Sequence, residues 1–355
     1  MSQFRYDAHP CGILVSAVSA LGTFFPDANP SLKGMDVLKH NKVSRDQQVA
    51  RILGKMPTIA AQSYRHRLGR PYNSPLSISD PSPLTYTENF LYMLDRLSET
   101  SYRPHPKLVS LLDKIWILHA EHGMNCSTAT MRQLASTGVD PYTAVAGATA
   151  ALYGNRHGGA NEAVLKMLSQ IGSVDAVPAF LKKVKKEKRI LFGFGHRVYK
   201  SPDPRATILK DIALEMFQIV GTPKLWPVAL ELERIAATDE YFTARHLFPN
   251  VDFYSGLIYD AMDLPSDFFP VLFSIPLTAG WLAHWMESLN EPTDVFEPKQ
   301  IYIGKQTIES PITPIQFRHS SLETPTVPLF SSGFDRRRRL GANYDTVIGT
   351  RRAKL

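Results

Sequence analysis

The sequence predicts an all-α protein. Apolar residues recur every three to four positions, which is the spacing of one helix face, whereas strand-like alternation is rare and short. No repeat of twenty to fifty residues is visible. Prolines separate the periodic segments, as expected at the joints between helices.

The segments with helical spacing, in chain order, read LVSLLDKIWIL over 108–118, AVAGATAAL over 144–152, AVLKML over 163–168, ILKDIALEMFQIV over 208–220 and LFSIPLTAGWLAHWM over 272–286. The apolar run at 271–279 is interrupted by two polar residues and Pro276, so no segment is expected to reach the length of a membrane span, and no membrane partner is expected. The basic run KKVKKEKR over 182–189 is expected to be the solvated face of a further helix.

The composition is typical of an intracellular protein with a large core. The chain has 355 residues, of which 44% are hydrophobic, enough for one main domain and a smaller inserted one. Only Cys11 and Cys126 are present, and neither spacing nor context suggests a disulfide or a zinc site. No signal peptide or transit peptide is recognisable.

The segment 191–205, LFGFGHRVYKSPDPR, combines groups suited to holding one anion. Gly193 and Gly195 leave backbone N–H groups without neighbouring side chains beside His196, so we expect these donors to face a polar or negatively charged acyl group. Arg205 can bind a carboxylate through two hydrogen bonds. An ordinary glycine turn between two helices is the competing interpretation.

Further regions place polar groups beside small or apolar residues. LHAEHGMNCSTAT over 118–130 and YGNRHGGANEA over 153–163 set histidines next to small residues. In FPNVDFYSG over 248–256, Asp252 lies among apolar and aromatic neighbours that would reduce its solvation and tune its basicity. A carboxylate in such surroundings suits proton abstraction.

Together with KMPTIAA over 55–61, NFLYM over 89–93 and GWLAHW over 280–285, these motifs resemble the citrate synthase family, in the family's order through residues 6–304. The resemblance implies an all-α, multi-helical citrate synthase-like fold with a large and a small domain. It also implies a condensation, in which an acyl-CoA is deprotonated at its α carbon, attacks the ketone of a 2-oxo acid such as oxaloacetate, and loses CoA by hydrolysis. The CoA thioester is then a substrate, and no cofactor or metal is expected.

The resemblance assigns the catalytic groups. Asp252 matches the general base that removes the α proton, and His157 matches the residue that hydrogen-bonds the thioester oxygen and stabilises the enol. His196 matches the residue that polarises the ketone.

The resemblance also assigns substrate contacts and implies a homodimer. His122 and Arg205 match residues that hold the 2-oxo acid. Matches to the family's CoA site are Gly193, Phe194, Gly195, Asn250 and, as a candidate contact for a CoA phosphate, Arg245.

Two positions depart from the family pattern, and both remove positive charge. Leu277 stands where the family usually has an arginine that grips the oxo acid, and Glu297 stands where an arginine crosses the dimer interface into the partner's site. Each lost charge-assisted contact costs about 1.5 to 3 kcal/mol, so we expect oxaloacetate to bind badly. A monocarboxylate 2-oxo acid, or one with an apolar or hydroxyl-bearing tail toward Leu277, fits better, although Lys299 is close enough in sequence to compensate in part.

The leading functional hypothesis is an acyl-CoA condensing enzyme, an acyltransferase that converts the acyl group into an alkyl group on transfer. Alkylcitrate synthases of specialised metabolism are its nearest functional relatives. A second hypothesis uses the same three catalytic groups for thioester hydrolysis, retro-Claisen cleavage or a cyclisation. A third is an inactive paralogue that dimerises with a complete synthase.

Two other histidines favour structural roles. His119 lies three residues before His122, so the two would share a helix face, but no cysteine or carboxylate cluster completes a metal site. His284, within its apolar helix, is expected to be a core histidine with satisfied hydrogen bonds.

The resemblance divides the chain into large-domain helices over 1–170, a small domain over 171–270, a return to the large domain over 271–304 and an extended, disordered basic tail over 305–355. The family normally has a substantial segment before the part matched by residues 1–9. The fold is therefore expected to be N-terminally shortened, either because the gene model is truncated or because the protein is a reduced form with weaker CoA binding.

The tail carries most of the chain's charge. Residues 335–355 hold six Arg and one Lys against two Asp, within a net charge of +7 for the whole chain. No base-reading or stacking motif accompanies this charge, so nucleic acid is not an expected partner. The chain ends in Ala353, Lys354 and Leu355, which resemble the Ser-Lys-Leu peroxisomal address. We expect a peroxisomal import receptor to bind these residues, and otherwise a cytoplasmic location.

Overall fold

The computed structural model describes residues 1–303 except Met35, 77–79, Pro81, Thr100, 155–156, 197–198 and 292–293. The chain divides into two compact units, residues 1–297 and 298–355. The helices and the site below belong to the first unit. The predicted tail over 305–355, with its terminal tripeptide, lies outside the described residues.

The described part of the chain is helical and contains no β-strand, so the all-α prediction is confirmed. An isolated bridge joins Phe194 to Pro249. The helices are α1 (Pro10–Leu21), α2 (Pro30–Lys33), α3 (Asp36–Lys39), α4 (Lys42–Arg67), α5 (Tyr86–Asp95), α6 (Pro106–His119), α7 (Cys126–Ser136), α8 (Pro141–Leu152), α9 (Ala160–Ile171), α10 (Val177–Glu187), α11 (Pro204–Val220), α12 (Trp226–Thr238), α13 (Glu240–Thr243), α14 (Val251–Ala261) and α15 (Phe269–Ser288).

Every segment with helical spacing lies within a helix, in α6, α8, α9, α11 and α15 respectively. Prolines stand in the first turn of α6, α8 and α11, where their missing N–H is harmless. Asp140 begins α8 by accepting a hydrogen bond from Thr143 N (3.0 Å). The expectation that prolines mark joints was wrong at Pro57 and Pro276, which lie inside α4 and α15.

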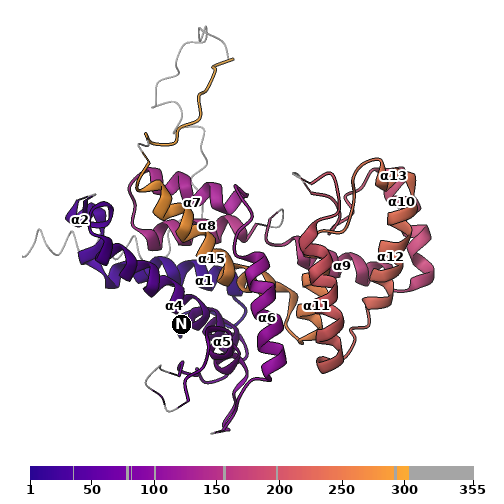
Figure 1. Ribbon diagram of the computed structural model, residues 1–355, viewed down its shortest axis with the longest axis horizontal. Helices are drawn as coiled ribbons and strands as arrows, with labels where there is room; N and C mark the ends of the chain where they lie inside the picture. Colours follow the sequence, from indigo (N-terminus) through magenta and orange to yellow (C-terminus); the bar gives the residue numbers. More distant parts are fainter. Residues whose placement is uncertain are drawn as a thin grey trace, which may run out of the picture. The chain divides into compact units, whose positions relative to one another are not determined.

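Helix α15 lies in the core and packs against α4, α6, α7 and α8 (Figure 1, orange). Its side chains Trp281 and Trp285 are buried. The helix continues through Pro276 because close packing offsets the hydrogen bond that proline cannot donate. The apolar helical run Ser266–Ser288 is therefore longer than predicted, and by length and composition it could cross a membrane. In its most apolar stretch of 18 residues, 78% is buried inside the protein.

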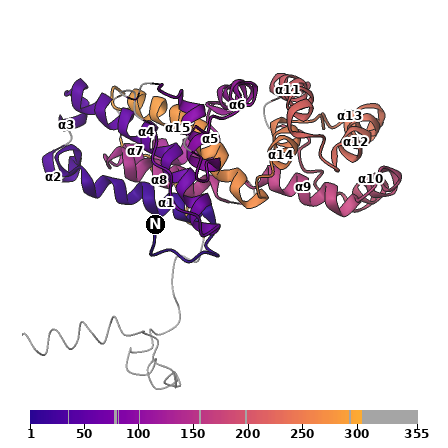
Figure 2. The same ribbon diagram turned by 90° about the horizontal axis from the view of Figure 1, so that it is seen from below.

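Helices α9 to α14 form a second group of neighbours (Figures 1 and 2). In this group α14 packs against α9 and α11, and α11 also contacts α6. Residues 1–297 nevertheless form one compact unit. The predicted division into large and small domains stays a prediction.

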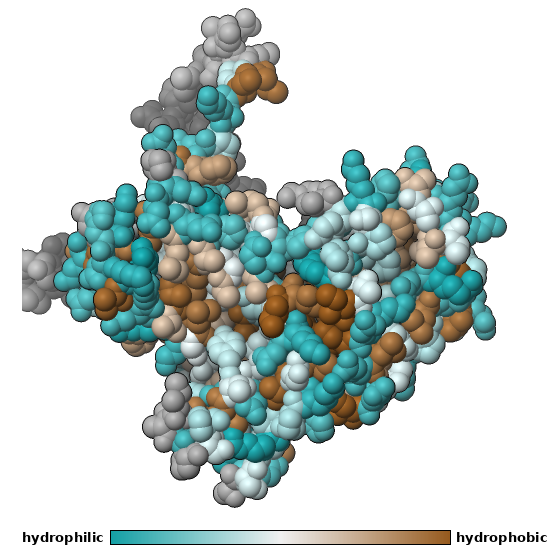
Figure 3. All heavy atoms as spheres, in the orientation of Figure 1, coloured by the Kyte–Doolittle hydropathy of each residue, from teal (hydrophilic) through white to brown (hydrophobic). Residues whose placement is uncertain are grey.

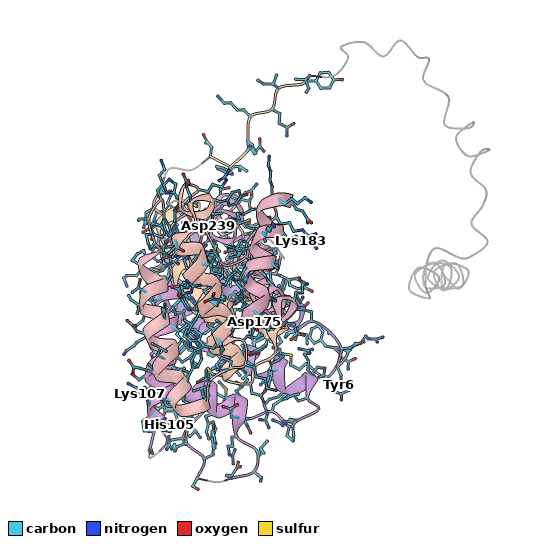
Figure 4. All side chains as sticks on the ribbon, turned by 90° about the vertical axis from the view of Figure 1, so that its right-hand side faces the viewer. Tyr6, His105, Lys107, Asp175, Lys183 and Asp239 are labelled. Carbon is cyan, nitrogen blue, oxygen red and sulfur yellow. The ribbon has the colours of Figure 1, made fainter. Side chains whose placement is uncertain are left out.

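The surface of α10 carries the basic run. Lys182, Lys183 and Lys186 are exposed, as predicted for a solvated helix face. Figure 4 shows Lys183 extending outward from α10. Lys185 instead pairs with Asp239 at 2.5 Å.

An apolar surface lies over α6 and α11, where hydrophobic residues gather in Figure 3. Ile117 on α6 is 74% exposed, and Ile208 on α11 is 46% exposed. Neither Ile117 nor Ile208 lines the cavity that contains His157 and Asp252.

Candidate active site

Side chains that are far apart in the sequence line one cavity of about 210 Å³. The predicted site residues in its lining are His122, His157, His196, Arg205, Asn250, Asp252 and Leu277. The other lining residues are His119, Asn125, Leu152, Gly158, Val251 and Phe273. A wider hollow of about 780 Å³ shares the three histidines at 122, 157 and 196 and adds Gly195 and Tyr199. A separate hollow of about 660 Å³, bordered by Tyr64 and Asp260, contains none of the predicted residues.

His157 lies between α8 and α9 and is oriented by Ser127 at the start of α7. Ser127 donates its backbone N–H to Nε2 of His157 (3.3 Å), and Ser127 Oγ lies 3.0 Å from the same nitrogen. A backbone N–H can only donate, so the proton of a neutral ring is on Nδ1. Burial lowers the pKa of His157. The side chain is therefore a neutral imidazole that keeps an N–H donor.

Tyr199 contacts two of the predicted histidines. Its phenol oxygen lies 2.7 Å from His122 Nε2, and its backbone N–H donates to His196 Nδ1 (3.3 Å). The rings of His122 and His196 meet edge to face with centroids 5.0 Å apart. Burial lowers the pKa of His122, and Arg205 lowers it further. Because Nδ1 of His196 accepts a hydrogen bond, the ring N–H of His196 is on Nε2.

Arg205 lies in the first turn of α11 and is oriented by Asp203. Its Nε and Nη2 donate to the two carboxylate oxygens of Asp203 (3.1 and 2.8 Å), and its backbone N–H donates to the same side chain (2.9 Å). Burial acts to raise the pKa of Asp203, but the hydrogen bonds from Arg205 outweigh it and hold the pKa below its usual value. This pairing leaves Nη1 of Arg205 for a substrate carboxylate.

Asp252 lies in the first turn of α14. Burial raises the pKa of Asp252 to about 6, against the smaller opposing effect of Arg205. This agrees with the desolvation expected from its apolar neighbours in the sequence. A carboxylate with this pKa is a stronger base than a solvated aspartate and is still ionised at neutral pH.

The glycine loop is closed by hydrogen bonds to the segment before α14. Gly195 N donates to Phe248 O (2.7 Å), and Asn250 N donates to Gly193 O (2.9 Å). Gly193 and Gly195 have φ of +78° and +84°, and a Cβ on Gly193 would lie 2.7 Å from Val164 Cγ2. The expectation that the Gly195 N–H is an open donor for an acyl group was wrong, because Phe248 accepts it.

Other predicted residues lie away from the cavity lining. Arg245 is exposed, with its guanidinium 3.9 Å from the ring centroid of Tyr241. Glu297 is also exposed, at the end of the first compact unit. Phe194 is buried against Phe253, with ring centroids 4.9 Å apart. Their contacts with CoA or with a partner subunit stay predictions.

His119, expected to have a structural role, has unusual surroundings. It is 3% exposed, its ring stacks on Phe273 with centroids 4.1 Å apart, and neither ring nitrogen has a hydrogen-bond partner among the described residues. Burial lowers the pKa of His119 to about 3. The expectation that His119 and His122 share a helix face was wrong, because α6 ends at His119 and His122 lies beyond it.

His284 was expected to be a satisfied core histidine, and this was wrong. It is only partly buried, with Nε2 3.2 Å from Glu121 Oε1. Its Nδ1 has no hydrogen-bond partner in the described part of the chain. Across that same part, no three His, Cys, Asp or Glu side chains are grouped closely enough to hold a metal ion.

Three residues that orient the site were not predicted from the sequence, namely Ser127, Tyr199 and Asp203. Asp203 had a usable signal, because an aspartate directly before a proline marks a helix start. Ser127 lies two residues after Asn125, whose side chain caps α7. An asparagine is a common N-cap, so the position of Ser127 in the first turn of a helix could also have been predicted. Tyr199 had no such signal, because only the folded loop brings it to both histidines.

A family model described as "Citrate synthase, C-terminal domain" matches residues 1–299. The chain is 58% identical to "Citrate synthase" of Dictyostelium discoideum, over 95% of this chain and 65% of that protein. It is also 58% identical to "Citrate synthase, glyoxysomal" of Cucurbita maxima, over 84% of this chain and 57% of that protein. The chain thus spans less than two thirds of the length of these curated relatives.

Solved structures agree with the family match. The citrate synthase of Pyrobaculum aerophilum superposes with a TM-score of 0.76 at 32% identity, over 88% of this chain and 75% of that chain. A citrate synthase from Thermoplasma acidophilum, in ternary complex with carboxymethyl coenzyme A and oxaloacetate, gives a TM-score of 0.75 at 28% identity, over 89% of this chain and 78% of that chain. By its sequence and by its fold, the chain belongs to the citrate synthase family.

Proposed function

We propose that this chain catalyses the condensation of an acyl-CoA with a 2-oxo acid. The α carbon of the thioester forms a bond to the keto carbon of the acceptor, and hydrolysis of the thioester then releases CoA. The observation that carries the proposal is the convergence of Asp252, His157 and His196 on one cavity. The Thermoplasma relative, solved with a CoA analogue and oxaloacetate, supports the same pair of substrate classes.

Enol formation is the first step. The Asp252 carboxylate accepts the α proton, and its raised pKa matches it to this task at neutral pH. The electrons of the broken C–H bond form the enol double bond, and charge develops on the thioester oxygen. The neutral His157 ring donates its Nδ1–H to that oxygen, which stabilises charge where it appears.

Carbon–carbon bond formation is the second step. His196 donates its Nε2–H to the keto oxygen of the acceptor, so the keto carbon becomes more electrophilic. Arg205 binds the acceptor carboxylate through Nη1. His122, whose Nε2 is hydrogen-bonded to the phenol of Tyr199, contacts the acceptor beside it. The enol α carbon attacks the keto carbon, and the keto oxygen takes the Nε2 proton of His196 to become a hydroxyl. His196 regains a proton from solvent, and Asp252 releases the α proton to solvent. Water then adds to the thioester carbonyl and the CoA thiol leaves.

The acceptor is proposed to be a 2-oxo acid other than oxaloacetate. Leu277 and Phe273 form part of the cavity wall. Among the described residues that line the cavity, Arg205 is the single arginine. Its guanidinium is already paired with Asp203. A second carboxylate directed at this wall therefore meets apolar side chains, which disfavours a dicarboxylate. The Thermoplasma relative, solved with oxaloacetate, points the other way, so both kinds of acceptor are assayed.

The apolar Leu277 also favours a second candidate function. The same base and enol-stabilising group would serve thioester hydrolysis, retro-Claisen cleavage or a cyclisation, none of which needs a dicarboxylate. The inactive paralogue is a third candidate. The complete set of Asp252, His157 and His196 argues against it.

Coenzyme A is proposed to act as a substrate carrier only, with no additional cofactor, and Arg245 is proposed to contact a CoA phosphate. The assembly is proposed to be a homodimer. A peroxisomal location, through import-receptor binding of Ala353, Lys354 and Leu355, is supported by the glyoxysomal relative and by the terminal tripeptide.

The proposal is tested with purified protein and acetyl-CoA, propionyl-CoA or a medium-chain acyl-CoA, each with oxaloacetate, pyruvate or 2-oxoglutarate. Free thiol and product mass are followed together, with Asp252→Asn as the inactive control. A condensed acid is the expected product. Thiol release without a condensed acid would favour hydrolysis. No turnover, together with no thermal stabilisation by any CoA ester or oxo acid, would favour the inactive paralogue.

A further inference from the structure

Asn250 connects the backbones of two residues that the proposed mechanism needs. Its Nδ2 donates to the carbonyl oxygen of Gly195 (2.9 Å), which belongs to the peptide bond leading into His196. Its Oδ1 accepts the backbone N–H of Asp252 (3.0 Å) and so caps α14. Both ends of one amide side chain are therefore engaged within the protein.

The backbone around this amide is held independently of it. Gly195 N donates to Phe248 O (2.7 Å) and Asn250 N donates to Gly193 O (2.9 Å), and these two bonds form the isolated antiparallel bridge between Phe194 and Pro249. These contacts do not involve the Asn250 side chain. Replacing that side chain is therefore expected to leave the two segments adjacent while loosening the peptide that carries His196.

We infer that Asn250 is a positioning residue that fixes His196 relative to Asp252. The inference rests on the proposed condensation, in which the enol formed at Asp252 must meet the keto carbon polarised by His196. A misplacement of either group by about 1 Å can cost up to about 100-fold in rate. The family resemblance implies a CoA contact for Asn250 instead, and the second N–H of the amide leaves that contact open.

Three variants separate the two ends of the amide. Asn250→Ser keeps an oxygen that can cap α14 but is too short to reach Gly195. Asn250→Asp keeps the cap and places a second acceptor against the Gly195 carbonyl. Asn250→Ala removes both contacts. We expect kcat to fall about 10- to 100-fold in all three, with the KM for acyl-CoA close to that of the wild type. The Tm should stay closest to that of the wild type in Asn250→Ser and fall clearly in Asn250→Ala.

Two kinetic results would overturn the inference. A raised KM for acyl-CoA at unchanged kcat would show that Asn250 acts as a CoA contact. A wild-type kcat in Asn250→Ser, with a loss only in Asn250→Ala, would show that the side chain serves α14 alone.

Hydrogen exchange gives a readout that does not depend on turnover. In Asn250→Ser and Asn250→Asp, the amides of residues 191–196 should exchange faster than in the wild type, because their attachment to residue 250 is weakened. Unchanged exchange across 191–196 would overturn the inference whether or not the enzyme is active. If the wild type forms no condensed acid but the variants exchange faster, the connection stands and the proposed function fails.

Discussion

The phenol oxygen of Tyr199 lies 2.7 Å from Nε2 of His122, while the backbone N–H of Tyr199 donates to His196. The ring of Tyr199 also lies 4.6 Å, between centroids, from that of His196. One residue thus orients both histidines that are proposed to contact the 2-oxo acid. Acceptor binding should therefore depend on Tyr199 although the sequence analysis gave it no role.

Tyr199→Phe removes the phenol and keeps the ring and the backbone N–H. A single hydrogen bond contributes about 0.5 to 1.5 kcal/mol, so we expect the KM for the 2-oxo acid to rise about 3- to 10-fold. The KM for acyl-CoA and the Tm should stay close to wild type. Initial rates of thiol release at varied acceptor concentration measure the effect. An unchanged acceptor KM would mean that His122 keeps its orientation without Tyr199.

The raised pKa of Asp252 predicts how activity depends on pH. The base must be ionised to accept a proton, and burial raises its pKa to about 6. We therefore expect kcat/KM for acyl-CoA to be level above this pH and to fall about tenfold per unit below it. A fall centred near the pKa of a solvated aspartate would show that Asp252 is not desolvated in the working enzyme.

The same pKa predicts a change in stability. Because the pKa of Asp252 in the folded protein lies above its value in the unfolded chain, the folded state binds the proton more tightly. The free energy of unfolding should then decrease as the pH rises from about 4 to about 6, and stay lower above that. Asp252→Asn should remove this decrease. The difference between the two unfolding curves, measured from pH 4 to pH 8, isolates the contribution of Asp252.

Local pattern was enough to predict the helices with regular apolar spacing, because the periodicity that predicts a helix is also the periodicity that builds the core. It failed at Pro276. There, the packing around α15 overrides the local preference of proline, and nothing within the segment reports that packing. The prediction for His284 failed for the same reason. Its helix is apolar, but the His284 side chain lies on a face of that helix that contacts Glu121.

Residue type and motif were enough to nominate Asp252, His157, His196 and Arg205, which all line the cavity. The hydrogen-bond partners of these groups could not be predicted from the sequence. The Gly195 N–H looked open because its acceptor, Phe248, is distant in the chain. Partners brought together only by folding decide which donors remain for a substrate.

His119 and His66 are both buried histidines and form a matched pair for a stability test. His119 has no hydrogen-bond partner among the described residues, whereas the ring nitrogens of His66 lie 3.0 Å from Tyr72 Oη and 2.9 Å from Phe4 O. An unpaired buried polar group costs about 1 to 3 kcal/mol. His119→Phe should therefore leave the Tm unchanged or raise it, and His66→Phe should lower it. Equal losses in a thermal melt would indicate that His119 has a partner in solution.

Two helical glycines predict opposite effects of the same substitution. A Cβ on Gly54, within α4, would meet nothing within 4 Å, while a Cβ on Gly280 would lie 2.2 Å from the carbonyl oxygen of Ala120. Gly54→Ala should stabilise the protein by about 0.5 to 1 kcal/mol. Gly280→Ala should destabilise it by about 1 to 3 kcal/mol, because α15 must move away from the end of α6. Urea unfolding measures both, and a stable Gly280→Ala protein would contradict the close approach of α15 to Ala120.

Leu277 is expected to set the choice of acceptor. It is 6% exposed and lines the cavity, where the guanidinium of Arg205 is already paired with Asp203. A guanidinium at position 277 would offer a second carboxylate a charge-assisted contact of about 1.5 to 3 kcal/mol. Leu277→Arg should therefore raise the ratio of kcat/KM for oxaloacetate to that for pyruvate about 10- to 100-fold, while Leu277→Met, of similar volume and no charge, should leave the ratio unchanged. A folded Leu277→Arg protein with the wild-type ratio would mean that the second carboxylate does not reach this wall, and that the acceptor is selected elsewhere in the cavity.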